Sequence, residues 1–345
     1  MISQEAVLQI LKNVKYPGYS RDIVSFGLIK EIQVEATAVG VLIELTSPNP
    51  EIGEQIADAA RLALRDGIPG LVDAHVQVKV PTAPQAATGP APRNRLPHIK
   101  RVIAVASGKG GVGKSTCSVN LACALRHVGA RVGLLDGDIY GPSIPLMMGV
   151  QQRPEITEEE HLVPPFAHGV RLMSMGFLIP DDQPVIWRGP MIQKTIQQFI
   201  HQVDWGELDY LLVDLPPGTG DAQLSLCQIV PLDGGVIVTT PQQASIGVVR
   251  KGMAMFEKVN VPLLGLIENM SYFTAPDGSR VEIFGHGGGA AEAERKGIPF
   301  LGEIPILPAV REGGDRGVPA VVSDPTGPAG QPFIRIAQAL RERLG

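Results

Sequence analysis

The stretch of sequence that decides the fold is residues 102–116, which read V-I-A-V-A-S-G-K-G-G-V-G-K-S-T. A short apolar run comes first, and a glycine-rich loop that ends in Lys-Ser follows it. The next segment, residues 117–128, fits a helix and is followed by Gly129, a residue type that often ends helices. The predicted order is therefore strand, glycine-rich loop, helix.

This loop has the pattern of a phosphate-binding loop, G-x-x-x-x-G-K-S/T. Glycines allow backbone N–H groups to point into one concavity, and a helix N-terminus adds positive potential there. We expect Lys114 to reach the β- and γ-phosphates of a nucleotide and the Ser115 hydroxyl to ligate Mg²⁺. The predicted nucleotide-binding residues of the loop are Gly108, Lys109, Gly110, Gly111, Val112, Gly113, Lys114, Ser115 and Thr116.

Lys109 is a second lysine, near the start of the loop, that an ordinary phosphate loop does not need. A catalytic cation at this position has to be held over the phosphates of its own or another subunit. A solvated loop lysine is the alternative interpretation.

Composition and charge limit the class of protein. The 345 residues, 44% hydrophobic and 19% charged, indicate a globular protein of about two domains. A net charge of −5 argues against a broad nucleic-acid-binding or anionic-membrane-binding surface. No apolar run approaches the roughly 18 residues of a membrane span, and residues 1–5 lack the features of a signal peptide. We therefore expect a cytoplasmic protein. Its three cysteines form no C-x-x-C pair and predict no disulfide framework: Cys117, Cys123 and Cys227.

Three regions follow from the chain's patterning. Residues 1–80 are predicted to form a small α+β domain, in which residues 22–34 and 39–45 are expected to be strands. Residues 81–98 contain five prolines among small and polar residues and are predicted to be an extended linker. Residues 99–345 alternate apolar strands with helical stretches.

That alternation predicts an α/β fold, a doubly wound and mostly parallel sheet covered on both faces. Strands are expected at residues 131–136 and 210–214, both ending in an aspartate. Ligands of such sheets bind at the carboxyl ends of the strands, so these acids can converge on the nucleotide. The last helix, residues 332–344, has one apolar face, and we expect it to dock onto the domain rather than onto a membrane surface.

Two acidic residues complete the predicted site. A phosphate loop needs an acid that positions Mg²⁺ and its waters, and Asp214 at the end of its strand is our candidate. The turn-rich residues 215–221 are placed to sense the γ-phosphate. Asp138, just past the second strand, can orient or activate the attacking water or contact Mg²⁺. An ordinary strand-to-helix turn is the alternative for residues 215–221, and a helix-capping or turn role is the alternative for Asp138.

At this point the motifs resemble a known family. Residues 109–115, K-G-G-V-G-K-S, match the deviant Walker A motif of MinD/ParA-type dimeric ATPases. The further motifs are similar to those of one branch, the Mrp/ApbC iron–sulfur cluster carriers, and residues 1–80 resemble the small domain fused in front of many of them. These motifs lie at residues 136–143, 214–221, 268–271 and 283–289.

The resemblance implies a homodimer that binds ATP with Mg²⁺, hydrolyses it slowly and delivers iron–sulfur clusters to apoproteins together with assembly factors. By the same analogy, Lys109 reaches the partner's ATP, Asp138 acts at the hydrolytic water and Asp214 holds the Mg²⁺ shell, with Lys114 as the other catalytic lysine. Asn269 is expected to contact adenine. Neither a nucleic acid nor stable membrane association is implied.

One departure concerns the cluster itself. The family usually carries C-P-x-C soon after the E-N-M-S motif, and its thiolates bridge a 4Fe–4S cluster at the dimer interface. Here Ala275 and Gly278 stand at the cysteine positions, and Asn49 stands where the small domain often has a cysteine. Soft thiolates are the usual ligands of such clusters. A lone His286 in a glycine-rich loop is a weak substitute.

Three functions are therefore compatible with the sequence. The first is an ATP-dependent iron–sulfur carrier or assembly factor that uses unusual ligands or a partner. The second is a MinD/ParA-like regulatory ATPase switch. The third is an ATP-dependent scaffold that holds no cluster itself.

Overall fold

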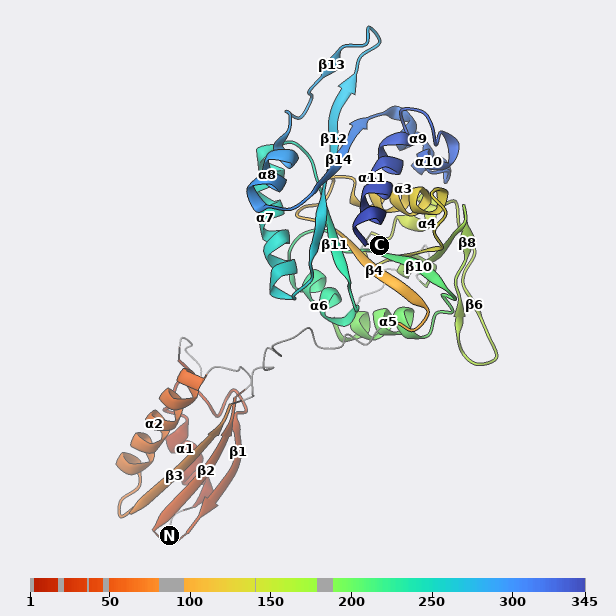
Figure 1. The fold of residues 1–345 in the computed structure, drawn as a ribbon. Helices are drawn as coiled ribbons and strands as arrows, with labels where there is room; N and C mark the ends of the chain where they lie inside the picture. Colours follow the sequence, from red (N-terminus) through yellow and green to blue (C-terminus); the bar gives the residue numbers. More distant parts are fainter. Residues whose placement is uncertain are drawn as a thin grey trace. The chain divides into compact units, whose positions relative to one another are not determined.

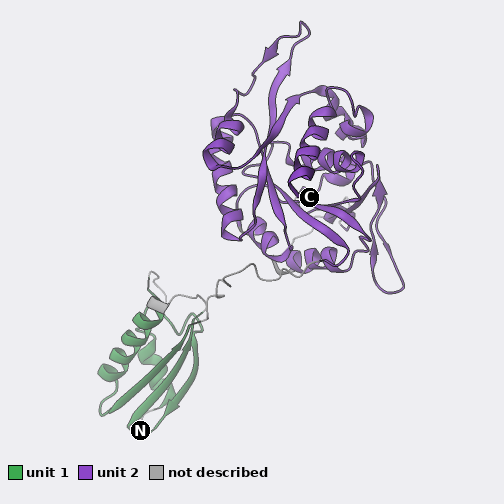
Figure 2. Cartoon of the chain, in the orientation of Figure 1, with its two compact units in different colours: residues 1–91 green, residues 92–345 purple. Residues whose placement is uncertain are grey.

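The structure is a computed structural model that describes residues 3–17, 22–35, 37–45, 50–80, 96–139, 141–178 and 189–344. The chain divides into two compact units, residues 1–91 and 92–345 (Figure 2). Most of the predicted linker, including residues 81–95, lies outside the described residues. The domain boundary at residue 80 therefore stays a prediction.

The first unit is a small α+β fold built on a three-stranded sheet in the order β1-β2-β3. Strands β1 and β2 are antiparallel, whereas β2 and β3 are parallel. Apolar side chains from both helices and from the sheet form one buried cluster that includes Val7, Ile43 and Leu64. The elements are α1 (Gln4–Leu11), β1 (Ile29–Val34), β2 (Ala38–Glu44), α2 (Pro50–Gly67) and β3 (Asp73–Lys79).

The strand predicted from residue 22 is wrong over its first seven residues. The carboxylate of Asp22 accepts hydrogen bonds from the backbone N–H and the hydroxyl of Ser25, each at 2.7 Å, and these bonds stabilise a turn. Gly27 then adopts a φ of +70°, which a β-strand does not allow. Pairing with β2 starts only at Ile29.

The second unit contains a nine-stranded sheet within the described residues, in the order β13-β12-β11-β4-β10-β5-β9-β8, with β14 beside β12 (Figure 1). All neighbouring pairs from β14 to β9 are parallel, and only the edge strands β8 and β13 run antiparallel. The strands are β4 (Ile99–Ser107), β5 (Val132–Asp136), β8 (Phe166–Ala167), β9 (Val170–Ser174), β10 (Leu208–Asp214), β11 (Gly234–Thr239), β12 (Leu263–Thr274), β13 (Arg280–Val281) and β14 (Phe300–Ile306).

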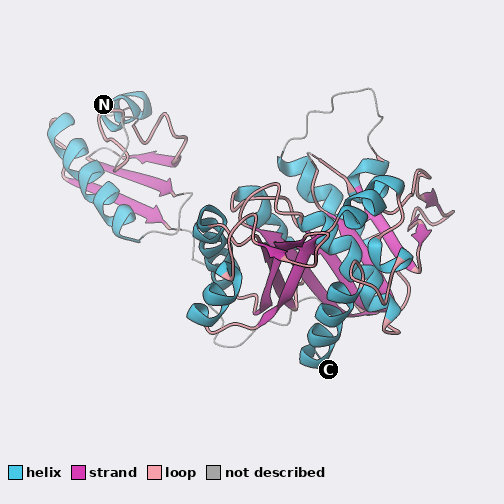
Figure 3. Cartoon of the chain, turned by 90° about the horizontal axis from the view of Figure 1, so that it is seen from above, coloured by secondary structure: helices cyan, strands magenta, loops and turns pink. Residues whose placement is uncertain are grey.

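Helices lie on both sides of this sheet (Figure 3), so the doubly wound, mostly parallel α/β fold is confirmed. A separate small ribbon pairs β6 (Glu155–Ile156) with β7 (Leu162–Val163), and a 3₁₀ turn covers Met175–Phe177. The helices are α3 (Lys114–His127), α4 (Ile144–Met147), α5 (Gly189–His201), α6 (Asp221–Ile229), α7 (Gln243–Lys258), α8 (Gly288–Lys296), α9 (Pro308–Arg316), α10 (Ala320–Ser323) and α11 (Gln331–Leu344).

Strand β4 is the centre of the sheet and leads directly into the glycine-rich loop. Its residues 102–107 are buried, as expected for a strand covered on both faces. The neighbouring strand β10 pairs with β4 and with β5, and the β10–β5 register sets Asp214 opposite Asp136. The carboxyl ends of these three strands therefore bring the loop and both aspartates to one edge.

The last helix, α11, docks onto the domain, as predicted. Phe333, Ile336 and Leu340 on its apolar face are buried in the same core cluster as the central strands. Arg335 lies on its exposed face.

We expect the Phe333→Ala substitution to lower the free energy of unfolding of this unit by about 3–5 kcal/mol, because it leaves a cavity under the helix. Urea unfolding followed by circular dichroism measures the change. Arg335→Ala is the matched control on the exposed face and should stay within about 0.5 kcal/mol of the wild type. Equal stabilities of the two variants would contradict the docking of α11.

Candidate nucleotide-binding site

The glycine-rich loop between β4 and α3 has a backbone that only glycines fit. Gly111 and Gly113 have φ values of +80° and +79°. A Cβ on Gly108 would lie 2.7 Å from the backbone carbonyl carbon of Val248, and one on Gly113 would lie 2.3 Å from the Asn269 amide nitrogen. The loop is therefore held between α7 and β12, in one shape.

Helix α3 begins at Lys114, three residues before the predicted start, because the left-handed Gly113 ends the loop. No side chain caps this N-terminus. Its free N–H groups and the helix dipole favour an anion. Lys114 and Ser115 consequently stand in the first helical turn, at the end of the loop.

A hollow of about 290 Å³ opens over this turn. The loop glycines and the helix start form one wall, and residues of three other segments form the rest. The lining residues are Ser107, Lys109, Gly110, Gly111, Gly113, Lys114, Ser115, Thr116, Asp138, Ser143, Met147 and Pro217. An uncapped helix end, a glycine cradle and a lysine suit the phosphates of a nucleotide.

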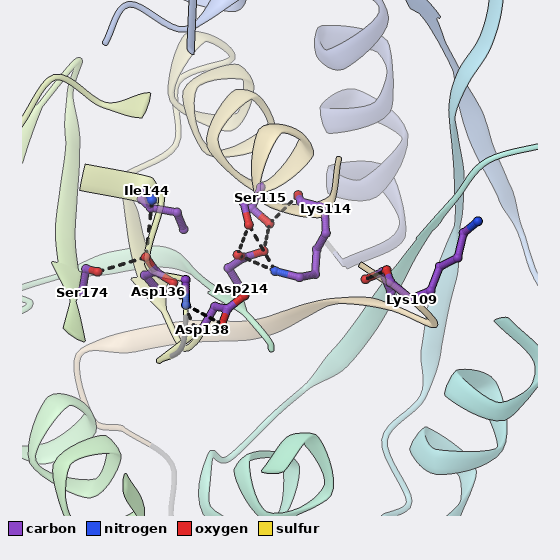
Figure 4. A network of polar contacts seen from close by, with 11 residues as sticks. Lys109, Lys114, Ser115, Asp136, Asp138, Ile144, Ser174 and Asp214 are labelled. Carbon is purple, nitrogen blue, oxygen red and sulfur yellow. Dashed lines mark hydrogen bonds and ion pairs between the residues drawn. The ribbon is translucent and has the colours of Figure 1, made fainter. Parts of the chain in front are cut away.

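A buried ion pair lies at the base of this hollow (Figure 4). The Lys114 ammonium nitrogen is 2.6 Å from Oδ2 of Asp214, and the side chains are 5% and 0% exposed. The hydroxyl of Ser115 donates to the same carboxylate oxygen at 2.7 Å, and the hydroxyl of Ser118 donates to Oδ1 at 2.5 Å. Both predicted metal-site residues, Ser115 and Asp214, are therefore in direct contact, and oxygen ligands of this kind suit Mg²⁺.

Asp136 is a second buried carboxylate, and it organises the neighbouring loop. Its Oδ1 accepts a hydrogen bond from the backbone N–H of Asp138 at 3.1 Å, and its Oδ2 accepts one from the Ser174 hydroxyl at 2.9 Å. The backbone N–H of Ile144, the first residue of α4, also donates to it. Burial raises the pKa of Asp136 to about 7, and the charge of Asp214 acts in the same direction, against the effect of the hydrogen bonds.

Asp138 is half-buried and lines the hollow, as its predicted role requires. The bond from its backbone to Asp136 fixes the start of the loop. Its own carboxylate accepts the backbone N–H of Gly141 at 3.3 Å, which is a turn-capping contact. The geometry is compatible with both predicted interpretations.

Lys109 lines the same hollow but does not join the Asp214 cluster. Its side chain points away from Lys114 in Figure 4, and its amino nitrogen is 3.4 Å from Oε1 of Gln242, the residue before α7. A cation beside a helix N-terminus is electrostatically unfavourable. This contact is therefore a weak restraint on Lys109.

Asn269 supports the loop from behind. Its amide nitrogen donates to the backbone carbonyl of Val112 at 2.9 Å, and the side chain is 7% exposed. Neither Asn269 nor Val112 lines the hollow, so adenine contact by Asn269 stays a prediction. The preceding Glu268 caps the glycine-rich start of α8 by accepting the backbone N–H of Gly289.

Several residues of the site were not predicted from the sequence. Ser118 lies one helical turn after Lys114, and this spacing was the available signal. Ser174 comes from β9, whose position beside β5 the sequence did not reveal. Met147, the last residue of α4, also lines the hollow, and no sequence pattern pointed to it.

A second hollow of about 590 Å³ lies at the opposite, amino ends of β4 and β10. Four of its charged side chains form two ion pairs: His98 lies 3.0 Å from Glu207, and Lys100 lies 2.8 Å from Asp209. It has neither a glycine cradle nor a helix N-terminus, so it does not compete as the phosphate site.

The segment that carries the cluster ligands in the resembling family forms a hairpin between β12 and β13. Its tip is closed by hydrogen bonds from the backbone N–H of Ala275 to Ser279 and from Gly278 to Ala275, each at 2.9 Å. The carboxylate of Asp277 accepts the N–H and hydroxyl of Ser279. No thiolate is available at this tip.

The remaining ligand candidates do not form a cluster site either. All three cysteines are buried, and burial raises the pKa of Cys123 and Cys227 to about 12 and that of Cys117 as well, so none is a ready thiolate ligand. His286 lies 3.2 Å from Glu282 at the surface. Within the described residues, no three His, Cys, Asp or Glu side chains gather as a metal site. Asn49 lies outside those residues.

Fold and site together define a P-loop nucleotide-binding protein. Comparisons with known proteins identify its family. The model of the family described as NUBPL iron-transfer P-loop NTPase matches residues 98–341, and the model of an iron-sulfur cluster assembly protein matches residues 4–78. The chain therefore belongs to the NUBPL iron-transfer P-loop NTPase family, and the resemblance found in the motifs is confirmed.

Two similar proteins support this assignment, and a third shows the same fold. The iron-sulfur cluster carrier protein of Synechocystis sp. is 44% identical over 350 residues, covering 100% of this chain and 98% of that protein. The nucleotide-binding protein of Archaeoglobus fulgidus, solved in complex with ADP, is 40% identical with a TM-score of 0.61, over 69% of this chain and 94% of that one. The cell division ATPase MinD of Pyrococcus furiosus shares the fold, at 23% identity and a TM-score of 0.54, over 71% and 99% of the two chains.

Among the described residues, none of the helices combines the length and the apolar character that crossing a membrane requires.

The Asp136 carboxyl predicts a pH dependence of stability. Its folded-state pKa of about 7 exceeds its ordinary value, so the folded protein binds this proton more tightly than the unfolded chain. The unfolding free energy should therefore fall as the pH rises from about 4 to about 7, with a limiting slope of about 1.4 kcal/mol for each pH unit.

Asp136→Asn removes this ionisation, and the variant should lose less stability than the wild type over the same pH interval. Urea unfolding at pH 5, 6, 7 and 8 measures the difference. Parallel stability curves for both proteins would show that Asp136 does not titrate in this interval.

Proposed function

We propose that this protein is an ATP-binding and slowly ATP-hydrolysing iron–sulfur cluster carrier or assembly factor that delivers clusters to apoproteins. The observation that carries the proposal is the contact of Lys114 and Ser115 with buried Asp214 at the base of the glycine cradle, with Asp138 on the opposite wall. Family membership and the names of the relatives support the iron–sulfur part.

The chain's residues divide the work of phosphate binding and hydrolysis. Lys114 and the N–H groups of the loop hold the β- and γ-phosphates, and the lysine exchanges part of its contact with Asp214 for the phosphate oxygens. Ser115 and Asp214 hold Mg²⁺, whose charge neutralises the phosphates when it is bound. Asp138 orients the attacking water and accepts its proton. Asn269 contacts adenine.

Two copies of the chain are needed for a complete site in this proposal. Lys109 belongs to the signature of the dimeric ATPases, yet here its side chain points away from the phosphate-binding end of its own loop. Release from Gln242 leaves Lys109 free to reach the nucleotide of a partner subunit. The proposed state is thus an ATP-dependent homodimer, located in the cytoplasm.

A specific observation favours a second candidate, a scaffold that couples ATP to client binding without holding the cluster itself. Ala275 and Gly278 replace the usual ligands, and the cysteines are buried with raised pKa values. In this version another protein supplies the thiolates, and we assign its binding to residues 4–78, which match the model of an iron-sulfur cluster assembly protein.

We expect Lys114→Ala to reduce ATP turnover to background, because it removes the cation that neutralises the phosphates. It also leaves Asp214 buried without its counter-charge, which costs about 3–5 kcal/mol of stability. Phosphate release measures the activity, and circular dichroism verifies folding.

Lys114→Gln keeps an N–H donor toward Asp214 and provides a second, better folded variant. Lys100→Ala alters an exposed lysine paired with Asp209 and serves as the control with unchanged turnover. Wild-type turnover in both folded Lys114 variants would refute the assigned site.

Anaerobic reconstitution with iron and sulfide separates the carrier from the scaffold. The scaffold version predicts only background iron and sulfide on the purified wild type. The double variant Ala275→Cys with Gly278→Cys restores the sequence C-P-D-C and should gain bound iron, although Gly278 has a φ of +83° that strains a cysteine there. Stoichiometric iron and sulfide on the wild type would instead establish the carrier version.

A further inference from the structure

Gln223 is a buried amide with no hydrogen-bond partner. It stands in the first turn of α6 and is 1% exposed. Neither its Oε1 nor its Nε2 is hydrogen-bonded, and among the described residues the only other buried side-chain atom in this state is Oε1 of Glu268. Buried polar groups are nearly always paired, and leaving both ends of an amide unpaired is costly.

Other buried polar side chains near the phosphate site, unlike Gln223, have hydrogen-bond partners. Ser118 donates to Asp214, and Asn120 donates to the backbone carbonyl of Thr116 and accepts the N–H of Val321. Gln228, on the same helix as Gln223, is exposed and has water available. The unpaired state of Gln223 is therefore a local exception beside the site.

The position of Gln223 tells which part of the molecule it can act on. Leu226 and Cys227 lie three and four residues later and are buried on the same face of α6. The side chain of Leu226 approaches to 3.6 Å from the Cβ position of Gly137. This face of α6 thus packs against the loop that carries Asp138.

Two loops meet at this point. Gly137 donates its backbone N–H to the carbonyl of Asp214 at 2.9 Å, at the end of β10. The segment between Asp214 and α6 is bonded to the end of β4 by the N–H of Leu215, which donates to the carbonyl of Val105 at 2.9 Å, and by the N–H of Gly218, which donates to the carbonyl of Ser107 at 3.2 Å. This segment leads directly into the first turn of α6, in which Gln223 stands.

We propose that Gln223 is a positioning residue for ATP hydrolysis: its amide pairs with the backbone of residues 137–139 only when ATP draws the two loops together. The new bonds satisfy the buried amide and fix the loop that carries Asp138. The inference rests on the proposed ATPase function, and it adds a residue that does not itself touch the nucleotide.

The variant Gln223→Met tests this, since it keeps the length of the side chain and removes the amide. Without nucleotide, we expect its melting temperature to rise by about 2 °C or more, because the buried unpaired amide of Gln223 is removed. We expect kcat to fall about tenfold, the effect of one lost hydrogen bond, with KM for ATP within about twofold of the wild type.

The decisive readout is the melting-temperature shift given by Mg²⁺ with AMP-PNP compared with that given by Mg²⁺ with ADP. The excess produced by AMP-PNP should be present in the wild type and less than half as large in Gln223→Met. Gln228→Met, the matched control on the exposed face of α6, should behave as the wild type in every measurement. If Gln223 had a purely structural role, Gln223→Met would change the melting temperature and leave kcat and the AMP-PNP excess as in the wild type.

Wild-type kcat together with a wild-type AMP-PNP excess in Gln223→Met would overturn the inference. If that variant does not fold, hydrogen exchange of wild-type residues 137–139 decides: stronger protection with AMP-PNP than with ADP supports the proposal, and equal exchange refutes it. A wild type that neither binds AMP-PNP nor hydrolyses ATP refutes the proposed function itself, which is a different result.

Discussion

The buried ion pair between Lys114 and Asp214 is the interaction on which the rest of the site depends. It joins the first turn of α3 to the last residue of β10 over 2.6 Å, with both side chains almost fully buried. Burying two charges is costly, and only close pairing and further hydrogen bonds compensate for it. Ser115 and Ser118 supply those bonds, so the pair stays in place only while the loop, the helix and the strand keep their positions. The same constraint keeps a lysine, an hydroxyl and a carboxylate together where phosphates and Mg²⁺ would bind.

The surroundings of this pair are two loops that start at neighbouring strands. Asp136 lies in register with Asp214 and holds the start of the Asp138 loop, while the segment after Asp214 leads into α6 and Gln223. The loops that follow Asp136 and Asp214 therefore begin at paired residues of adjacent strands. Lys109 is the exception, because its restraint is a single long contact with Gln242. A cation held this weakly beside the cradle fits a group that acts outside its own subunit.

The sequence predicted the parts of the molecule that local patterns determine. The phosphate loop, the strands ending in Asp136 and Asp214, and the apolar face of α11 follow from glycine spacing and hydrophobic periodicity. Strand pairing is non-local, so the contact of Ser174 with Asp136 and the absence of partners for Gln223 could not be read from the chain. The strand expected from residue 22 was wrong because side-chain hydrogen bonds of Asp22 stabilise a turn in an otherwise apolar stretch. The missing thiols at positions 275 and 278 were visible in the sequence, and within the described residues no other ligands gather at the tip of that hairpin.

A mixing experiment tests most directly whether two copies build each ATP site. Lys109→Ala and Lys114→Gln chains are each expected to be inactive alone. In a mixed dimer, the site of the Lys109→Ala chain has its own Lys114 and receives Lys109 from the other chain. Random pairing at equal amounts makes about a quarter of all sites complete, so the mixture should recover about a quarter of wild-type turnover. No recovery in a mixture shown to contain mixed dimers would mean that Lys109 acts within its own subunit, and would contradict this account.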